Sequence, residues 1–142
     1  MSRSDATRLA AGVSGGLLLA LLAAAPAAAA STVSIELNRL EPRDGACRVS
    51  LVVANPGDKS IDSLKLDLVF FDKEGVISRR LAVEAGPLRA SKTSVKLFDA
   101  SDTDCGSVSR VLLNDVTSCG GEQDCLGLVT TTSRVKGVEF GK

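Results

Sequence analysis

One segment, residues 61–72, constrains the fold most, because apolar and polar side chains alternate along it in the order IDSLKLDLVFFD. A period of two is that of a β-strand, in which successive side chains point to opposite faces of a sheet. The strand places four apolar side chains on one face: Leu64, Leu66, Leu68 and Phe70. Lys65 and Asp67 lie on the other face. We therefore expect the rest of the chain to pack against the apolar face of this strand.

Residues 1–30 are typical of a secretory signal peptide. Arg3 and Arg8 give the chain a basic start, and after Arg8 the segment carries no charge. A leucine cluster is followed by Pro26 and a series of alanines, and we expect cleavage before Ser31. The uncharged run is also about long enough to span a bilayer as an uncleaved anchor. Its strongly apolar part is short, so we favour cleavage, after which no membrane anchor remains.

The remaining part, residues 31–142, is long enough for a single domain with one modest core. Positive and negative side chains balance over the whole chain, with 17 of each, so no polybasic or polyacidic surface is expected. Tyr and Trp are absent. A nucleic-acid binder needs positive charge along the phosphates and aromatic rings that stack on bases. We therefore exclude nucleic acid as a partner.

Short alternating segments separated by turn residues continue along this domain. The further segments with this pattern are 31–40, 47–54, 76–84, 93–98, 108–116 and 126–140. Pro and Gly in the connections, as at Pro56 and Gly57, end strands and form turns. About seven short strands predict an all-β fold, an immunoglobulin-like antiparallel β-sandwich.

Two of these strands carry charges that bear on their place in a sheet. Arg79 in the fourth strand falls at a position of the apolar parity, which predicts a β-bulge or an edge position there. The fifth strand is β-branched at Thr93 and Val95. Ser94 and Lys96 are assigned to its polar face.

Four cysteines follow the leader: Cys47, Cys105, Cys119 and Cys125. An even number in an exported chain predicts disulfides, and the lack of histidine and of C-x-x-C pairs argues against zinc. If successive strands alternate in direction, the first two cysteines lie at one end of the sandwich and the last two at the other. We expect the bridges Cys47–Cys105 and Cys119–Cys125, which would stabilise the fold by roughly 4 and roughly 2 kcal/mol through chain entropy.

The segment 51–99 resembles the FxLYD type of bacterial extracytoplasmic β-sandwich. The resemblance rests on Asn55 before a turn, on the run LKLDLVFFDKEGV and on the later run GPLRASKTSVKLFD. Of the five-letter signature, Asp72 is retained, and Phe71 stands at the position of the tyrosine. The chain is also similar to small exported proteobacterial proteins described as Tat pathway signal sequence domain proteins, although its leader has no twin arginine. The resemblance implies a secreted sandwich and transfers no catalytic residue.

No set of side chains suggests catalysis. Without histidine, Ser–His and Cys–His pairs cannot form. Ser–Lys pairs are conceivable at Ser91 with Lys92 and at Ser94 with Lys96, but a solvated strand edge accounts for them better. Paired carboxylates are better read as solvated surface acids, because a sugar cleft would need the aromatic lining that this chain lacks. We expect a protein that is not an enzyme and that needs no cofactor.

The acidic loop from Asp99 to Asp104 (DASDTD) raises the question of calcium binding, since closely spaced oxygen ligands suit a hard cation. An EF-type loop requires glycine at its sixth position and glutamate at its twelfth. Those positions are Asp104 and Arg110. We therefore prefer a polar loop beside a disulfide.

The densest basic stretch comprises Arg79, Arg80, Arg89 and Lys92. Such charges could meet an acidic partner or a phospholipid head group. Edge strands commonly carry them to discourage aggregation, and we favour that role.

The sequence therefore predicts a periplasmic or secreted protein. Our first hypothesis is a non-enzymatic protein-binding or accessory module of the cell envelope, which engages another envelope protein through a strand edge or through the loops. The alternative is a small-ligand or calcium carrier that uses the loop from Asp99 to Asp104. The identity of the partner and the oligomeric state do not follow from the sequence.

Overall fold

The computed structural model describes residues 32–121 and 124–142, and these residues form an all-β fold. The strands are β1 (Val33–Arg43), β2 (Ala46–Asn55), β3 (Lys65–Phe71), β4 (Ile77–Glu84), β5 (Lys92–Ser101), β6 (Arg110–Ser118), β7 (Val129–Ser133) and β8 (Glu139–Gly141). One short 3-10 helix, η1 (Cys105–Ser107), connects β5 to β6. The predicted signal peptide, residues 1–30, lies outside the described residues. Within the described ranges, no helix is long and apolar enough to cross a bilayer.

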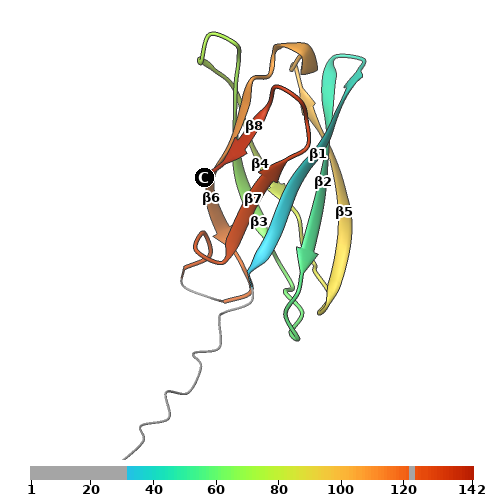
Figure 1. Cartoon of the computed structure of the whole chain (residues 1–142), viewed down its shortest axis with the longest axis vertical. Helices are drawn as coiled ribbons and strands as arrows, with labels where there is room; N and C mark the ends of the chain where they lie inside the picture. Colours follow the sequence, from blue (N-terminus) through green and yellow to red (C-terminus); the bar gives the residue numbers. More distant parts are fainter. Residues whose placement is uncertain (1–31, 122–123) are drawn as a thin grey trace, which may run out of the picture.

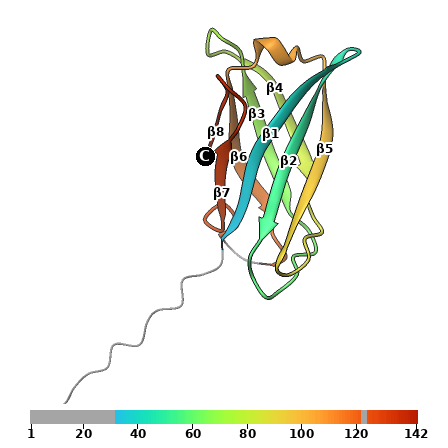
Figure 2. The same cartoon turned by 45° about the vertical axis from the view of Figure 1, so that its right-hand side comes forward.

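Two four-stranded sheets pack face to face as a β-sandwich. One sheet has the strand order β5-β2-β1-β7, and the other has the order β4-β3-β6-β8. Figure 1 and Figure 2 show these two layers and place β5 along one side of the sandwich in both views. The edge strands β4 and β5 contact each other on that side, and the edge strands β7 and β8 contact each other on the other side.

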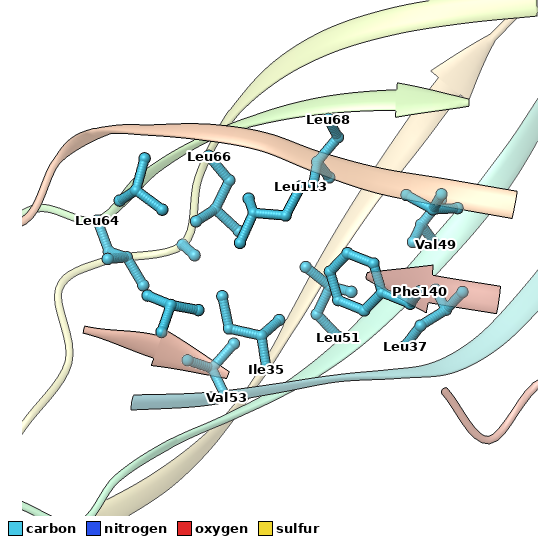
Figure 3. Packing of buried hydrophobic residues seen from close by; sticks show 14 of the residues in the cluster. Ile35, Leu37, Val49, Leu51, Val53, Leu64, Leu66, Leu68, Leu113 and Phe140 are labelled. Carbon is cyan, nitrogen blue, oxygen red and sulfur yellow. The ribbon is translucent and has the colours of Figure 1, made fainter. Parts of the chain in front are cut away.

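The core lies between the sheets, and the strand that the sequence places at its centre is β3. Leu66, Leu68 and Phe70 have no exposed surface, and Leu64 just before β3 is also buried, so the predicted burial of this face is confirmed. Figure 3 shows these leucines opposite the buried side chains of the other sheet. Those from β1 and β2 are Ile35, Leu37, Val49, Leu51 and Val53.

The strand boundaries, number and directions differ from the prediction in four ways. β3 begins at Lys65, because the segment before it leaves the sheet and Ile61 makes an isolated bridge with Leu88. β1 runs on to Arg43 through the predicted turn, and its end pairs with the beginning of β2. The described residues contain eight strands rather than about seven. β7 pairs parallel with β1, and β8 pairs parallel with β6, because the last segment crosses from one sheet to the other between its strands.

Both predicted disulfides are confirmed. Cys47 at the start of β2 is bonded to Cys105 in η1, with 5.0 Å between the Cα atoms. Cys119 is bonded to Cys125 in the connection from β6 to β7, with 5.5 Å between the Cα atoms. Each bridge therefore ties together loop regions at one end of the sandwich, as the alternation of strand directions implies.

Candidate functional site

The longest outer edge of the sandwich belongs to β5. This strand pairs with β2 over all ten of its residues, from Lys92 to Ser101, without a register shift. On its other side, no described strand pairs with it. Edge strands in proteins are usually short, bulged, charged or covered, because a free edge invites another chain to pair with it. A straight free edge of this length is therefore a candidate binding site.

The register identifies the backbone groups that β5 leaves free. The N–H of Asp102 donates to the carbonyl of Gly45 at 2.8 Å, and this pair continues the register of β2 and β5. Alternate residues of an antiparallel strand direct their N–H and C=O groups to opposite sides. Even-numbered residues of β5 therefore bond to β2, and odd-numbered residues, from Thr93 to Asp99, direct their backbone groups to the free side. No loop among the described residues donates a backbone hydrogen bond to that side.

The two faces of β5 are reversed relative to the prediction. Ser94 and Lys96, which the sequence assigned to the polar face, lie on the inner side of the sheet and are half-buried. Val95 and Leu97 lie on the outer face and are 63% and 60% exposed. The cause is the register, since residues directly opposite each other share a face and Lys96 is opposite the buried Leu51. The inner side therefore also receives the half-buried ring of residue 98, a phenylalanine.

The outer face of the β5 edge is apolar at its centre. Val95 is opposite Val52 of β2, which is half-buried. Leu97 is opposite Ser50. Beyond Leu97, the carboxylate of Asp99 accepts hydrogen bonds from Arg48 at 2.8 and 3.0 Å. We call the exposed pair Val95 and Leu97, with Val52 beside them, the β5 apolar patch.

The other edge strand on this side, β4, is protected. Phe70 pairs with Arg79 and Phe71 pairs with Ile77, so Ser78 is the extra residue of a β-bulge. β4 is also the outer strand of its sheet, so both features predicted from Arg79 are confirmed. A bulge bends and twists an edge and interrupts its hydrogen-bonding groups.

A polar cluster on the outer face fastens β4 to β3. Arg80 donates two hydrogen bonds, of 2.9 and 2.7 Å, to the carboxylate of Asp67, and Asn114 of β6 donates a third, of 2.7 Å. Asp67 is only 7% exposed. The hydrogen bonds from Arg80 and then from Asn114 hold the pKa of Asp67 below its ordinary value of 3.8. The carboxylate therefore stays ionised and acts as a clamp between three strands.

The acidic loop does not gather its carboxylates at one point. Asp99 is paired with Arg48, and the Arg48 hydrogen bond lowers the pKa of Asp99. Asp104 accepts from the N–H of Gly106 at the start of η1. Asp102 is exposed, and its nearest cation is Arg79, at 4.0 Å. In the described part of the chain, no group of three His, Cys, Asp or Glu residues is placed to hold a metal ion.

A hollow of about 310 Å³ adjoins this loop, between the β1–β2 hairpin and the residues that follow β5. Its lining includes Arg43 together with Asp102 and Asp104. Two carboxylates beside a guanidinium leave little net charge for a cation to use. The geometry of this end therefore does not favour the carrier hypothesis.

The candidate Ser–Lys pairs form no hydrogen bond with each other among the described contacts. The hydroxyl of Ser91 donates to the carbonyl of Gly57 at 3.4 Å. The ammonium of Lys96 donates to the carbonyl of Pro87 at 3.3 Å. Ser94 and Lys96 share the inner face of β5, and the described contacts contain no hydrogen bond between them. Ser91 and Lys96 therefore have structural partners on the backbone.

The members of the predicted basic stretch lie around the β4 and β5 edges. Arg79 is on the inward face of β4, and Arg80 is on its outer face, where it binds Asp67. Arg89 is exposed in the loop between the two strands, and Lys92 is exposed at the beginning of β5. Arg89 and Lys92 make no ion pair within 4.0 Å with a described residue, whereas Arg80 is paired with Asp67.

These features define a class of protein, a disulfide-bonded β-sandwich with one protected and one unprotected edge strand. Comparison of the chain with protein-family models, with curated proteins and with solved structures finds no match. The function is therefore inferred from the geometry of the chain itself.

Proposed function

We propose that this protein is a non-enzymatic protein-binding or accessory module of the cell envelope, and that it binds an extended segment of another envelope protein along the free edge of β5. In this mode, called β-strand addition, the backbone of the partner supplies the hydrogen bonds and alternate side chains supply specificity.

The observation that carries the proposal is the length of the β5 edge, which has neither a bulge nor a described strand paired on its free side. Its odd-numbered residues present free backbone groups, and two of them present exposed apolar side chains, Val95 and Leu97. An exposed apolar edge is an aggregation hazard unless it has a use. A partner strand would satisfy the backbone groups and cover the apolar patch in the same event.

Export of the chain is part of the proposal. Disulfides persist in oxidising compartments such as the periplasm and the outside of the cell. The two bridges of the sandwich fit such a location, and so does the leader pattern of residues 1–30.

Site-specific photo-crosslinking in cells tests the proposed function. A photoreactive amino acid replaces Leu97 in the full chain, and the matched control replaces Ile77 of β4, which is equally exposed at 61% against 60%. We expect a discrete adduct with an envelope protein from position 97 and none from position 77. Equal labelling from both positions, or none from position 97, would contradict the proposal.

A pair of proline variants separates backbone pairing from simple contact. Val95→Pro removes an N–H that faces the free side, so no hydrogen bond to β2 is lost. Ala82→Pro is its counterpart on β4, where Ala85 donates to Leu64 and thereby places the N–H of even-numbered residues outward. We expect Val95→Pro to abolish the adduct at position 97 and Ala82→Pro to leave it. Persistence of the adduct in Val95→Pro would mean that no strand is added.

A further inference from the structure

We infer that the segment which pairs with β5 alternates apolar and acidic side chains. This inference rests on the proposed function and names the chemistry of the partner. A strand added to a sheet continues both faces of that sheet with its own alternate side chains. The two faces of the β5 edge therefore select the side chains of the partner separately.

On the outer face, the added strand meets apolar side chains. Residues of the partner opposite Val95 and Leu97 point to the same side as these two residues. Apolar partner side chains there would cover the β5 apolar patch. Charged side chains would lose hydration when they pack against the patch, which costs free energy. The outward positions of the partner are therefore apolar.

On the inner face, the added strand meets positive charge. Its residues opposite Ser94 and Lys96 point to the inner face of the sheet, on which these two side chains lie. The Lys96 ammonium has three N–H donors, and its one hydrogen bond among the described residues goes to the Pro87 carbonyl. Lys92, further along the same face, is exposed and makes no ion pair within 4.0 Å with a described residue.

A second cation, Arg79 of the neighbouring sheet, lies near the end of β5. Arg79 lies on the inward face of β4, and its Nε is buried without a hydrogen-bond partner among the described residues. Its only carboxylate neighbour in the described part is Asp102, at 4.0 Å, and that carboxylate is largely in water. A carboxylate on the inner face of an added strand would therefore meet Lys96, whereas Arg79 lies beside Asp102, past the end of β5.

Two acidic side chains of this region, Asp99 and Glu84, are already engaged. Asp99 is held by Arg48 on the outer face. Glu84 accepts hydrogen bonds from the N–H groups of Leu64 and Gly86, at 2.7 and 2.8 Å. Lys96 and Lys92 therefore remain available to a partner, and the charge of that partner is negative.

A second copy of this chain fits the edge less well. In a two-fold antiparallel pairing that matches Val95 of one copy with Leu97 of the other, the two Lys96 side chains are directly opposite each other. Like charges in directly opposite positions of a sheet are destabilising. An inward-pointing lysine is also a device that protects an edge from self-pairing. In this register, the opposed Lys96 side chains favour an acidic partner over self-association.

Binding of two synthetic peptides to the mature domain tests this inference. Both have the length of β5. In one, valine alternates with glutamate, and in the other, valine alternates with lysine. We expect the glutamate peptide to bind at least about tenfold more tightly at low salt, with the difference shrinking as salt is added. Lys96→Glu should reverse this order, and Lys96→Gln should remove most of the difference without introducing a new charge.

Controls separate failure of the inference from failure of the proposed function. Equal binding of both peptides that Val95→Pro abolishes would overturn the acidic preference and leave the use of the edge intact. If neither peptide binds while position 97 still forms its adduct in cells, the acidic preference is likewise overturned and the use of the edge stays intact. Peptide binding that survives Val95→Pro would overturn both proposals. A dimer in sedimentation that Val95→Pro dissolves would overturn the inference in favour of a second copy.

Discussion

The two edge strands on one side of the sandwich, β4 and β5, meet the same physical problem in different ways. β4 carries a bulge at Ser78, and its Arg80 is clamped to the buried Asp67. β5 has no bulge and exposes Val95 and Leu97. The bulge and the clamp therefore protect the edge of β4, and the neighbouring edge of β5 has neither of them.

The two strands are also held by different means. The disulfide between Cys47 and Cys105 fastens η1, which follows β5, to the beginning of β2. β4 has no covalent link to another strand among the described residues, and its outer face depends on the Asp67 cluster. The covalent link lies beyond the end of β5 and uses none of the side chains of its outer face.

The largest expected effect concerns the disulfides. The bridge near β5 closes 58 residues, and the bridge between Cys119 and Cys125 closes 6. Chain entropy predicts that Cys47→Ala with Cys105→Ala lowers the free energy of unfolding by about 4 kcal/mol, and that Cys119→Ala with Cys125→Ala lowers it by about 2 kcal/mol. Urea denaturation measures both. The reverse order would show that β5 does not depend on its covalent link.

A smaller effect is expected at the clamp of β4. Asp67→Ala removes three hydrogen bonds to a buried carboxylate, and the free energy of unfolding should fall by about 2 kcal/mol, since Arg80 and Asn114 can turn to water. Asp99→Ala removes a similar pair from β5, but Asp99 is exposed, so we expect a clearly smaller loss. Equal losses would show that the Asp67 cluster of β4 stabilises the fold no more than the Asp99–Arg48 pair of β5 does.

The acid dependence of stability should show a still smaller difference. The pKa of Asp67 is lowered in the fold, so its contribution is fully present above the unfolded value of 3.8 and is lost as the pH falls through the lower folded value. Asp67→Asn should therefore flatten the fall of the unfolding free energy below that pH. Asp99, Glu36 and Glu84 also have lowered pKa values, so part of the slope should remain. An unchanged slope in Asp67→Asn would exclude the clamp as an acid-sensitive contact.

The parts of the fold that follow from local pattern were predictable from the sequence. The alternation around Leu66 and Leu68 identified the buried face of β3, and alternating strand directions led to both cysteine pairs. Arg79 predicted the bulged edge because a charged side chain is costly to bury and an edge or a bulge gives it access to water. These inferences needed only the period of a strand and the cost of burying charge.

The features of the candidate site were not predictable in the same way. In β5, both faces carry one or more apolar residues, with Val95 on one parity and Phe98 on the other, so alternation alone does not say which face turns inward. The register with β2 decides, and it places Lys96 inside. A signal existed in the continuation to Ala100, which extends the parity of Phe98 and is buried opposite Cys47.

The parallel pairings of β7 and β8 depend on contacts between distant segments, which no local pattern encodes.

Amide hydrogen exchange along β5 tests the central claim most directly. In the free domain, the N–H groups of Lys96 and Phe98 should exchange slowly because they bond to β2, and those of Val95 and Leu97 should exchange fast because they face the free side. Saturation with the glutamate peptide should slow Val95 and Leu97 and leave the amides of β4 unchanged. Slow exchange at Val95 and Leu97 in the free domain, or no change there on saturation, would contradict the account.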